Sequence, residues 1–168
     1  RTKSVSIRSL LSRPALRNVI VAFSLSPPIF AKRFDEKAPP VQARLKAIKA
    51  LGEAGWLLGL RFDPLLYAQD WRNQYDALFE SIDRLGINDQ IHSVSTGPLR
   101  FPKKMHKRIA DLYPESELFA APLEQRDGVT AYPDAIEREM KTFAEERLER
   151  QLGKHRLFHC QSEGGTLS

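Results

Sequence analysis

The chain has 168 residues, of which 42% are hydrophobic and 28% are charged, a balance typical of one globular domain. Lys and Arg number 26 against 21 Asp and Glu, so the formal charge of +5 permits a polyanionic partner, although solvated helix faces explain it equally well. The chain has no run of about 18 apolar residues, which argues against a membrane span. The single cysteine, Cys160, excludes an internal disulfide and a thiolate metal cage. Together these features predict a cytoplasmic protein.

In chain order, the first predicted strand is the apolar run at residues 18–25, which ends next to Ser24 and Ser26. Apolar residues at helical spacing predict a helix over 40–55. A second strand over 56–62 is expected to stop at Asp63-Pro64, because proline cannot donate to a ladder. A helix over 70–85 and a strand over 91–95 follow. Strands alternating with helices predict a parallel sheet, with ligand sites at the carboxyl ends of the strands.

The pattern changes after residue 98. A basic helix is predicted over 103–113, a hairpin over 125–132 around the Asp127-Gly128 turn, a long helix over 133–152 and a last strand over 156–160. The polar, glycine-rich residues 161–168 predict a disordered tail. We therefore expect one unit at 1–98, an extension at 99–160 and a tail at 161–168.

Residue types alone give no strong catalytic signature. The four histidines lack metal-ligand spacing, and His159 and Cys160 are adjacent on a predicted strand, so their side chains point to opposite faces. Two features are more informative. Arg61 and Asp63 lie at a predicted strand end, where either an internal ion pair or a ligand contact explains them. A second feature is a basic cluster around Phe101, whose cations suit a phosphate backbone: Arg100, Lys103, Lys104, Lys107 and Arg108.

Several short motifs at constant separation resemble the spore photoproduct lyase family and its radical-SAM relatives. The resemblance implies an α/β fold, namely the C-terminal portion of a radical-SAM partial (β/α) barrel with a C-terminal α+β extension. It covers nearly the whole chain. The matching residues are Phe23-Ser24, Phe34-Asp35, Arg44, Ala54-Gly55-Trp56, Asp63-Pro64 and the aromatic helix with Trp71, Tyr75 and Phe79.

The resemblance also implies a cofactor site. In that family a lysine on the preceding strand and the serine of the Phe-Ser strand end line the S-adenosylmethionine pocket, and the matching residues are Lys3 and Ser24. The strand end before proline approaches the cofactor there, which implies Asp63 as a neighbour. This chain has aspartate where spore enzymes have a small apolar residue. A carboxylate near the ribose or the sulfonium is electrostatically sensible.

The same resemblance implies damaged duplex DNA as a partner. The Arg100-Phe101 pair, the basic helix and Tyr113-Pro114 match the segment that leads to a DNA-engaging hairpin. The hairpin carries Arg126 and is poorer in basic residues than in spore enzymes, so a related lesion fits as well as the thymine dimer. The residues expected to bind DNA are Arg100, Lys103, Lys104, Lys107 and Arg126.

The family's cysteine motif for a [4Fe–4S] cluster does not occur in this sequence, and one cysteine cannot ligate such a cluster. The chain is therefore expected to be the C-terminal half of a longer enzyme, inactive by itself, that works with its missing N-terminal half. The full-length protein is expected to be a carbon–carbon lyase that repairs pyrimidine-dimer-type lesions by 5′-deoxyadenosyl radical chemistry. The alternatives are a self-standing, non-catalytic DNA-binding module and a fragment without a function of its own.

Overall fold

A computed structural model describes residues 1–35, 37–112 and 121–159 of the chain. Its main sheet has four parallel strands in the order β1-β2-β3-β7. These strands are β1 (Ile20–Ser24), β2 (Leu57–Leu65), β3 (Ile91–Pro98) and β7 (Leu157–His159). The prediction of a parallel α/β sheet is confirmed. The predictions for Tyr113-Pro114, Cys160 and the tail at 161–168 lie outside the described residues.

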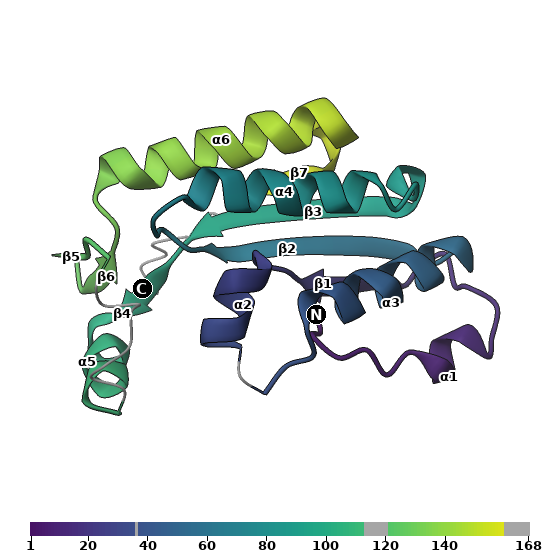
Figure 1. Cartoon of the computed structure of the whole chain (residues 1–168), viewed down its shortest axis with the longest axis horizontal. Helices are drawn as coiled ribbons and strands as arrows, with labels where there is room; N and C mark the ends of the chain where they lie inside the picture. Colours follow the sequence, from purple (N-terminus) through teal and green to yellow (C-terminus); the bar gives the residue numbers. More distant parts are fainter. Residues whose placement is uncertain (36, 113–120, 160–168) are drawn as a thin grey trace, which may run out of the picture.

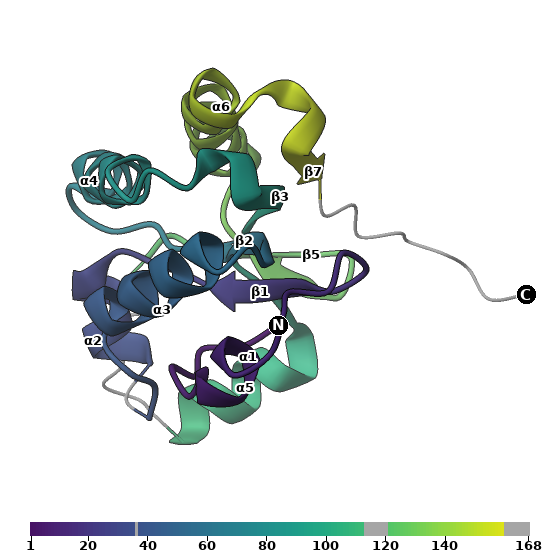
Figure 2. The ribbon, with the colours of Figure 1, turned by 90° about the vertical axis from the view of Figure 1, so that its right-hand side faces the viewer.

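Three helices lie on one side of the main sheet, as Figures 1 and 2 show: α3 (Val41–Glu53), α4 (Trp71–Asp83) and α6 (Asp134–Leu152). α3 contacts β2, α6 contacts β3 and α4 contacts α6. Two shorter helices, α1 (Arg8–Leu11) and α2 (Pro28–Phe34), flank β1 in sequence. The structure also has short 3-10 turns at Asn88–Gln90 and Lys154–Arg156. Apart from α1, α2 and these turns, the helices match the predicted periodic segments.

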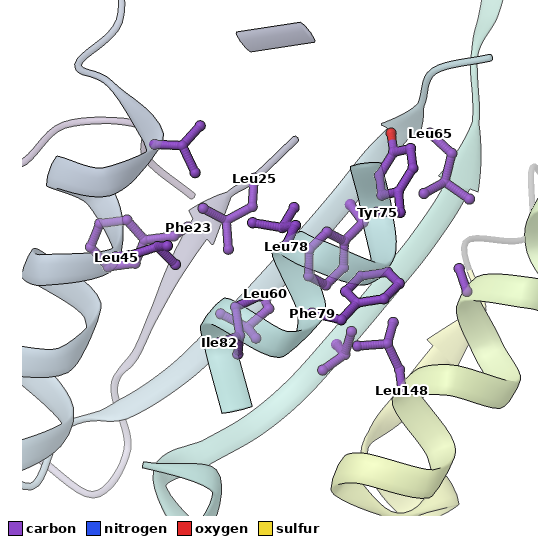
Figure 3. Close-up of a cluster of buried hydrophobic side chains, with 14 of the residues drawn as sticks. Phe23, Leu25, Leu45, Leu60, Leu65, Tyr75, Leu78, Phe79, Ile82 and Leu148 are labelled. Carbon is purple, nitrogen blue, oxygen red and sulfur yellow. The ribbon is translucent and has the colours of Figure 1, made fainter. Parts of the chain in front are cut away.

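The core fills the space between this layer of helices and the sheet. Alternate residues of the strands point toward the helices, so Phe23, Leu60 and Phe62 are completely buried. They meet the apolar faces of α3 and α4, and Figure 3 shows Phe23 and Leu60 beside Leu45, Leu78, Phe79 and Ile82. The rings of Phe62 and Phe79 lie edge to face at 5.1 Å. Each such side chain contributes about 1.5–3 kcal/mol by leaving water.

A small antiparallel sheet with the order β4-β6-β5 stands beside the carboxyl end of β3. Asp127 and Gly128 form the turn between β5 (Glu124–Arg126) and β6 (Val129–Ala131), both with positive φ, as the predicted hairpin turn requires. The third strand, β4 (Arg100–Pro102), pairs with β6. No strand was predicted at residues 100–102; β4 forms because the hairpin gives this segment a strand to pair with. α5 (Lys103–Leu112) follows directly.

The predicted end of the second strand is wrong. β2 continues through Asp63 and Pro64 to Leu65, with a cis peptide bond between Asp63 and Pro64. The register against β3 shifts between Phe62 and Leu65, and Leu65 pairs with Pro98. The shift accommodates Pro64, which has no N–H to donate, so pairing resumes one residue later.

No helix within the described ranges is long and apolar enough to cross a membrane.

Candidate functional site

A cavity of about 200 Å³ opens at the carboxyl ends of β1 and β2. Ligands bind at this edge in parallel sheets, because the strand ends leave loops free to shape a pocket there. Lys3, Ser24 and Asp63, which the sequence proposed for the cofactor, all line it although they come from three separate segments. The lining residues are Lys3, Ser24, Leu25, Ser26, Phe34, Asp35, Asp63, Pro64, Leu66, Leu99 and Phe101.

Lys3 reaches the cavity from an N-terminal segment that runs parallel to β1, beside its carboxyl end. Thr2 forms a single parallel bridge to Phe23, and the Thr2 carbonyl accepts a hydrogen bond from the Ser24 N–H at 2.9 Å. The Lys3 ammonium lies 2.5 Å from Asp35 Oδ1. Pairing of this segment with β1 thus places Lys3 at the end of the strand. There its ammonium forms an ion pair with the carboxylate of Asp35.

Arg44 holds the other oxygen of Asp35. Its Nη2 lies 3.0 Å from Asp35 Oδ2, and its guanidinium also donates to the carbonyls of Ser24 at 3.2 Å and Pro39 at 2.9 Å. The Arg44 side chain is 1% exposed. A buried guanidinium needs this complete set of acceptors, since an unpaired buried charge is very unfavourable.

Asp63 lies between strands β1 and β3 at the same edge. The Ser95 hydroxyl donates to Asp63 Oδ2 at 2.8 Å, and the Arg1 guanidinium lies 3.6 Å from that oxygen. Arg1 also donates to the Ser24 hydroxyl at 2.6 Å and to the Asp63 carbonyl. Arg61, the other charge at this strand, lies over Gly59 and donates to Ser93 Oγ at 2.8 Å. The side chains of Arg61 and Asp63 are therefore both hydrogen-bonded to serines of β3, Ser93 and Ser95 respectively.

Two buried tyrosines fix the segment after β2 that completes the cavity wall. The Tyr75 hydroxyl accepts a hydrogen bond from the Leu66 N–H at 2.8 Å, and the Tyr132 hydroxyl accepts one from the Tyr67 N–H at 3.0 Å. Burial raises the pKa of Tyr75 above its usual range, and burial raises the pKa of Tyr132 to about 12, against the opposing effect of the backbone hydrogen bond. Both phenols therefore stay protonated at neutral pH and hold the backbone of residues 66–67 by hydrogen bonds.

A second cavity of about 410 Å³ lies on the far side of the wall that Asp63 forms. It opens between the ends of β2 and β3, the small sheet and the helices α5 and α6. It shares Asp63, Pro64, Leu99 and Phe101 with the first cavity. Its other lining residues are Thr96, Gly97, Pro98, Arg100, Met105 and Lys141. The two cavities are thus neighbours with a common wall.

The basic segment predicted to bind DNA forms α5 and projects away from the three helices on the main sheet (Figure 1). Lys104, Lys107 and Arg108 are exposed, and their spacing of three and four residues brings them to one face. The opposite face carries His106, whose ring lies 6.2 Å from that of Phe101. The side chain of Lys103 lies outside the described part of the chain.

The other two predicted DNA-binding residues make ion pairs within the protein. Arg126 pairs with Asp134 and donates to the Tyr132 carbonyl at 2.7 Å. Arg100 lies 3.1 Å from Glu137 of α6, and Arg126 lies 3.9 Å from the same carboxylate. Lys104 and Lys107 therefore face solvent, whereas Arg100 and Arg126, although partly exposed, also connect the small sheet to α6.

Sequence reasoning assigned no role to several polar residues in the first cavity or bonded to the residues around it. Asp35 and Arg44 were part of the motif pattern, but only the folded chain brings them to Lys3. Ser93 and Ser95 are polar residues two apart on a buried strand, a spacing that places them on one face and that indicated a polar surface. Among the described residues, no group of three or more His, Cys, Asp or Glu side chains is arranged to hold a metal ion.

Comparison with known proteins identifies the family of this chain. A family model described as spore photoproduct lyase matches residues 1–157. The chain belongs to the spore photoproduct lyase family. The resemblance inferred from the motifs is confirmed. The spore photoproduct lyase of Bacillus subtilis (strain 168) is 28% identical over 98 residues, which are 57% of this chain and 29% of that protein.

Solved structures of spore photoproduct lyases share the fold. A mutant with bound AdoMet and dinucleoside spore photoproduct superposes with a TM-score of 0.75 at 20% identity, over 94% of this chain and 48% of that chain. Another mutant with dinucleoside spore photoproduct gives a TM-score of 0.76, over 94% and 49%. The chain thus spans about half the length of these structures.

Proposed function

We propose that this chain forms the part of a radical-SAM DNA-repair lyase that binds S-adenosylmethionine and contacts damaged duplex DNA. Its parallel sheet is then a section of a partial (β/α) barrel. One observation carries the proposal: Lys3, Ser24 and Asp63, far apart in the sequence, line one cavity at the carboxyl ends of β1 and β2. The family supports a relationship to DNA-repair lyases, and one related structure holds AdoMet together with a dinucleoside lesion.

The chemistry of the first cavity fits part of an S-adenosylmethionine molecule. The Lys3 ammonium suits a carboxylate, the Ser24 hydroxyl can donate or accept, and the Asp63 carboxylate suits ribose hydroxyls or a positive sulfonium. Apolar walls such as Phe34 and Leu66 suit an aromatic base. When bound, the cofactor supplies radical chemistry at carbon. The residues of this chain bind it, orient it and screen it from water.

The chain does not fit the [4Fe–4S] cluster that this chemistry needs. Cluster ligation takes several thiolates, and the sequence contains one cysteine. We therefore assign the cluster to the N-terminal half of a full-length protein, which is also the proposed partner of the edge at β1.

DNA binding is assigned to the surface around α5. Lys104, Lys107 and Arg108 present three cations on one exposed face, which suits neighbouring phosphates of a duplex. Phe101 and Met105, the latter on α5 itself, line the second cavity. A nucleotide turned out of a duplex bound at α5 would therefore meet apolar side chains there.

The test is cofactor titration of the full-length protein carrying Lys3→Ala or Ser24→Ala. Loss of a charged or hydroxyl contact is expected to weaken S-adenosylmethionine binding roughly tenfold while DNA affinity stays unchanged. Ser81→Ala is the matched control, because the Ser81 hydroxyl on the outer side of α4 donates to the Ala77 carbonyl of its own helix and lines neither cavity. Unchanged cofactor affinity and unchanged release of 5′-deoxyadenosine in both variants would remove these residues from the site.

A second candidate, a self-standing DNA-binding module, is favoured by the exposed basic face of α5. It predicts that the isolated chain binds duplex DNA with an affinity that falls steeply with salt. Binding of the isolated chain measured at several salt concentrations separates the two. Salt-dependent affinity without any cofactor binding in the full-length protein would favour the module.

A further inference from the structure

One buried side chain connects two of the residues proposed to hold the cofactor, Ser24 and Lys3. Arg44 donates to the Ser24 carbonyl at 3.2 Å and contacts Asp35 at 3.0 Å, and Asp35 in turn lies 2.5 Å from the Lys3 ammonium. We propose that Asp35 and Arg44 are positioning residues of the first cavity, which fix the Lys3 ammonium and the Ser24 end of β1 in the geometry that the cofactor needs. This inference rests on the proposed cofactor site.

The two oxygens of Asp35 each contact a different cation. Oδ2 faces Arg44, which is 1% exposed and cannot move without leaving a charge unpaired, so the carboxylate has a fixed orientation. Oδ1 then sets where the Lys3 ammonium lies. Lys3 is 43% exposed and has a long, flexible side chain. Without Asp35 it would sample many rotamers, and binding would have to order it at a cost in affinity.

The acceptors of Arg44 also point to the cavity rather than to packing alone. A buried apolar side chain of similar volume often packs as well as a buried charge does. Of the three acceptors that Arg44 bonds among the described residues, two instead belong to residues that line the first cavity, Asp35 and Ser24. The third, the Pro39 carbonyl, lies in the segment that leads into α3. The guanidinium therefore joins β1, α2 and α3 at the place where Ser24 and Lys3 meet.

A double-mutant cycle in the full-length protein tests the inference. Asp35→Asn keeps the shape of the side chain and removes its charge, and Lys3→Met removes the ammonium. Asp35→Asn is expected to weaken S-adenosylmethionine binding roughly fivefold in the wild-type background and less than about twofold in the Lys3→Met background. Glu139→Gln, which breaks the exposed ion pair with Arg72, is the control and leaves the affinity unchanged.

Equal losses of affinity in the two backgrounds would mean that Asp35 acts without Lys3. No loss in either background would mean that Asp35 does not affect cofactor binding. Each outcome overturns the inference.

If the wild-type protein binds no cofactor, the proposed function fails. Amide hydrogen exchange of this chain then tests the positioning role by itself. Asp35→Asn is expected to speed exchange of the Ser24 N–H, which bonds Thr2, at least about threefold, and to leave that of Leu78 in α4 unchanged. Unchanged exchange at Ser24 would contradict the positioning role.

Discussion

At the scale of single residues, the cavity wall depends on polar atoms that the core has enclosed. Tyr75 is 1% exposed, and its hydroxyl is the partner of the Leu66 N–H. Tyr75→Phe leaves that N–H buried without an acceptor, so we expect the free energy of unfolding to fall by about 1–3 kcal/mol. Urea unfolding measures it. Ser81→Ala on the exposed side of the same helix is the control, and a loss as large in that variant would contradict the explanation.

The two buried tyrosines also predict how stability depends on alkaline pH. Burial raises the pKa of Tyr132 from 10.0 to about 12 in the folded chain and raises that of Tyr75 as well. Above pH 10 the unfolded chain loses phenolic protons that the folded chain keeps. The stabilisation is therefore complete below pH 10 and is lost progressively toward pH 12. Urea midpoints followed across this window, with Tyr132→Phe for comparison, measure the slope, which should be shallower in the variant.

At the scale of elements, the exposed helix α5 and the hairpin carry arginines and lysines in different surroundings. Lys104 and Lys107 face solvent, so Lys104→Gln and Lys107→Gln should weaken duplex binding about equally for all sequences. Each lost phosphate contact should lower the salt slope by about one unit while the fold keeps its stability. DNA titrations at several salt concentrations check this. A salt slope unchanged in both variants would remove α5 from the DNA surface.

Arg126 should behave differently from these lysines. It pairs with Asp134, bonds the Tyr132 carbonyl and is 35% exposed, so Arg126→Gln should lower the melting temperature by a few degrees through the contact between hairpin and α6. Calorimetry of the variant beside Lys104→Gln makes the comparison. Equal melting temperatures would show that the ion pair contributes nothing measurable to stability.

Periodicity and turn chemistry predicted the main elements because their causes are local. The amphipathic spacing of α3 and α4 and the Asp127-Gly128 turn are properties of short segments. β4 was missed because its three residues form a strand only when β6, far along the chain, lies beside it. The end of β2 was misplaced because the shift in register at Pro64 depends on β3. Such pairings are properties of the fold and not of the segment.

The candidate site shows the same contrast between features that local sequence predicts and features that depend on distant segments. Lys3, Ser24 and Asp63 were named from motif resemblance, and the structure brings them to one cavity. The ion pair between Asp35 and Lys3 and the bond between Ser95 and Asp63 join residues 32 apart in the sequence, for which no local spacing rule exists. The charges of Arg100 and Arg126 suggested DNA, which stays a prediction. That both also lie near the Glu137 carboxylate of α6 depends on packing between distant segments, which no local pattern indicates.

At the scale of the whole molecule, we expect the isolated chain of residues 1–168 to bind no iron–sulfur cluster, because its one cysteine cannot supply the thiolates. Anaerobic reconstitution followed by iron and sulfide analysis checks this. A stoichiometric, cysteine-ligated [4Fe–4S] cluster in the monomeric chain would contradict the assignment of the cluster to another part of the protein.

The wall shared by the two cavities has a thermodynamic consequence. Asp63, Pro64, Leu99 and Phe101 face both spaces, so a molecule that displaces this wall from one side changes the free energy of binding on the other. Linkage makes such an effect reciprocal: whatever factor the first ligand imposes on the affinity of the second, the second imposes on the first. A ligand that moved these four residues from one cavity would therefore change the affinity of the other cavity for its own ligand by the same factor in both directions.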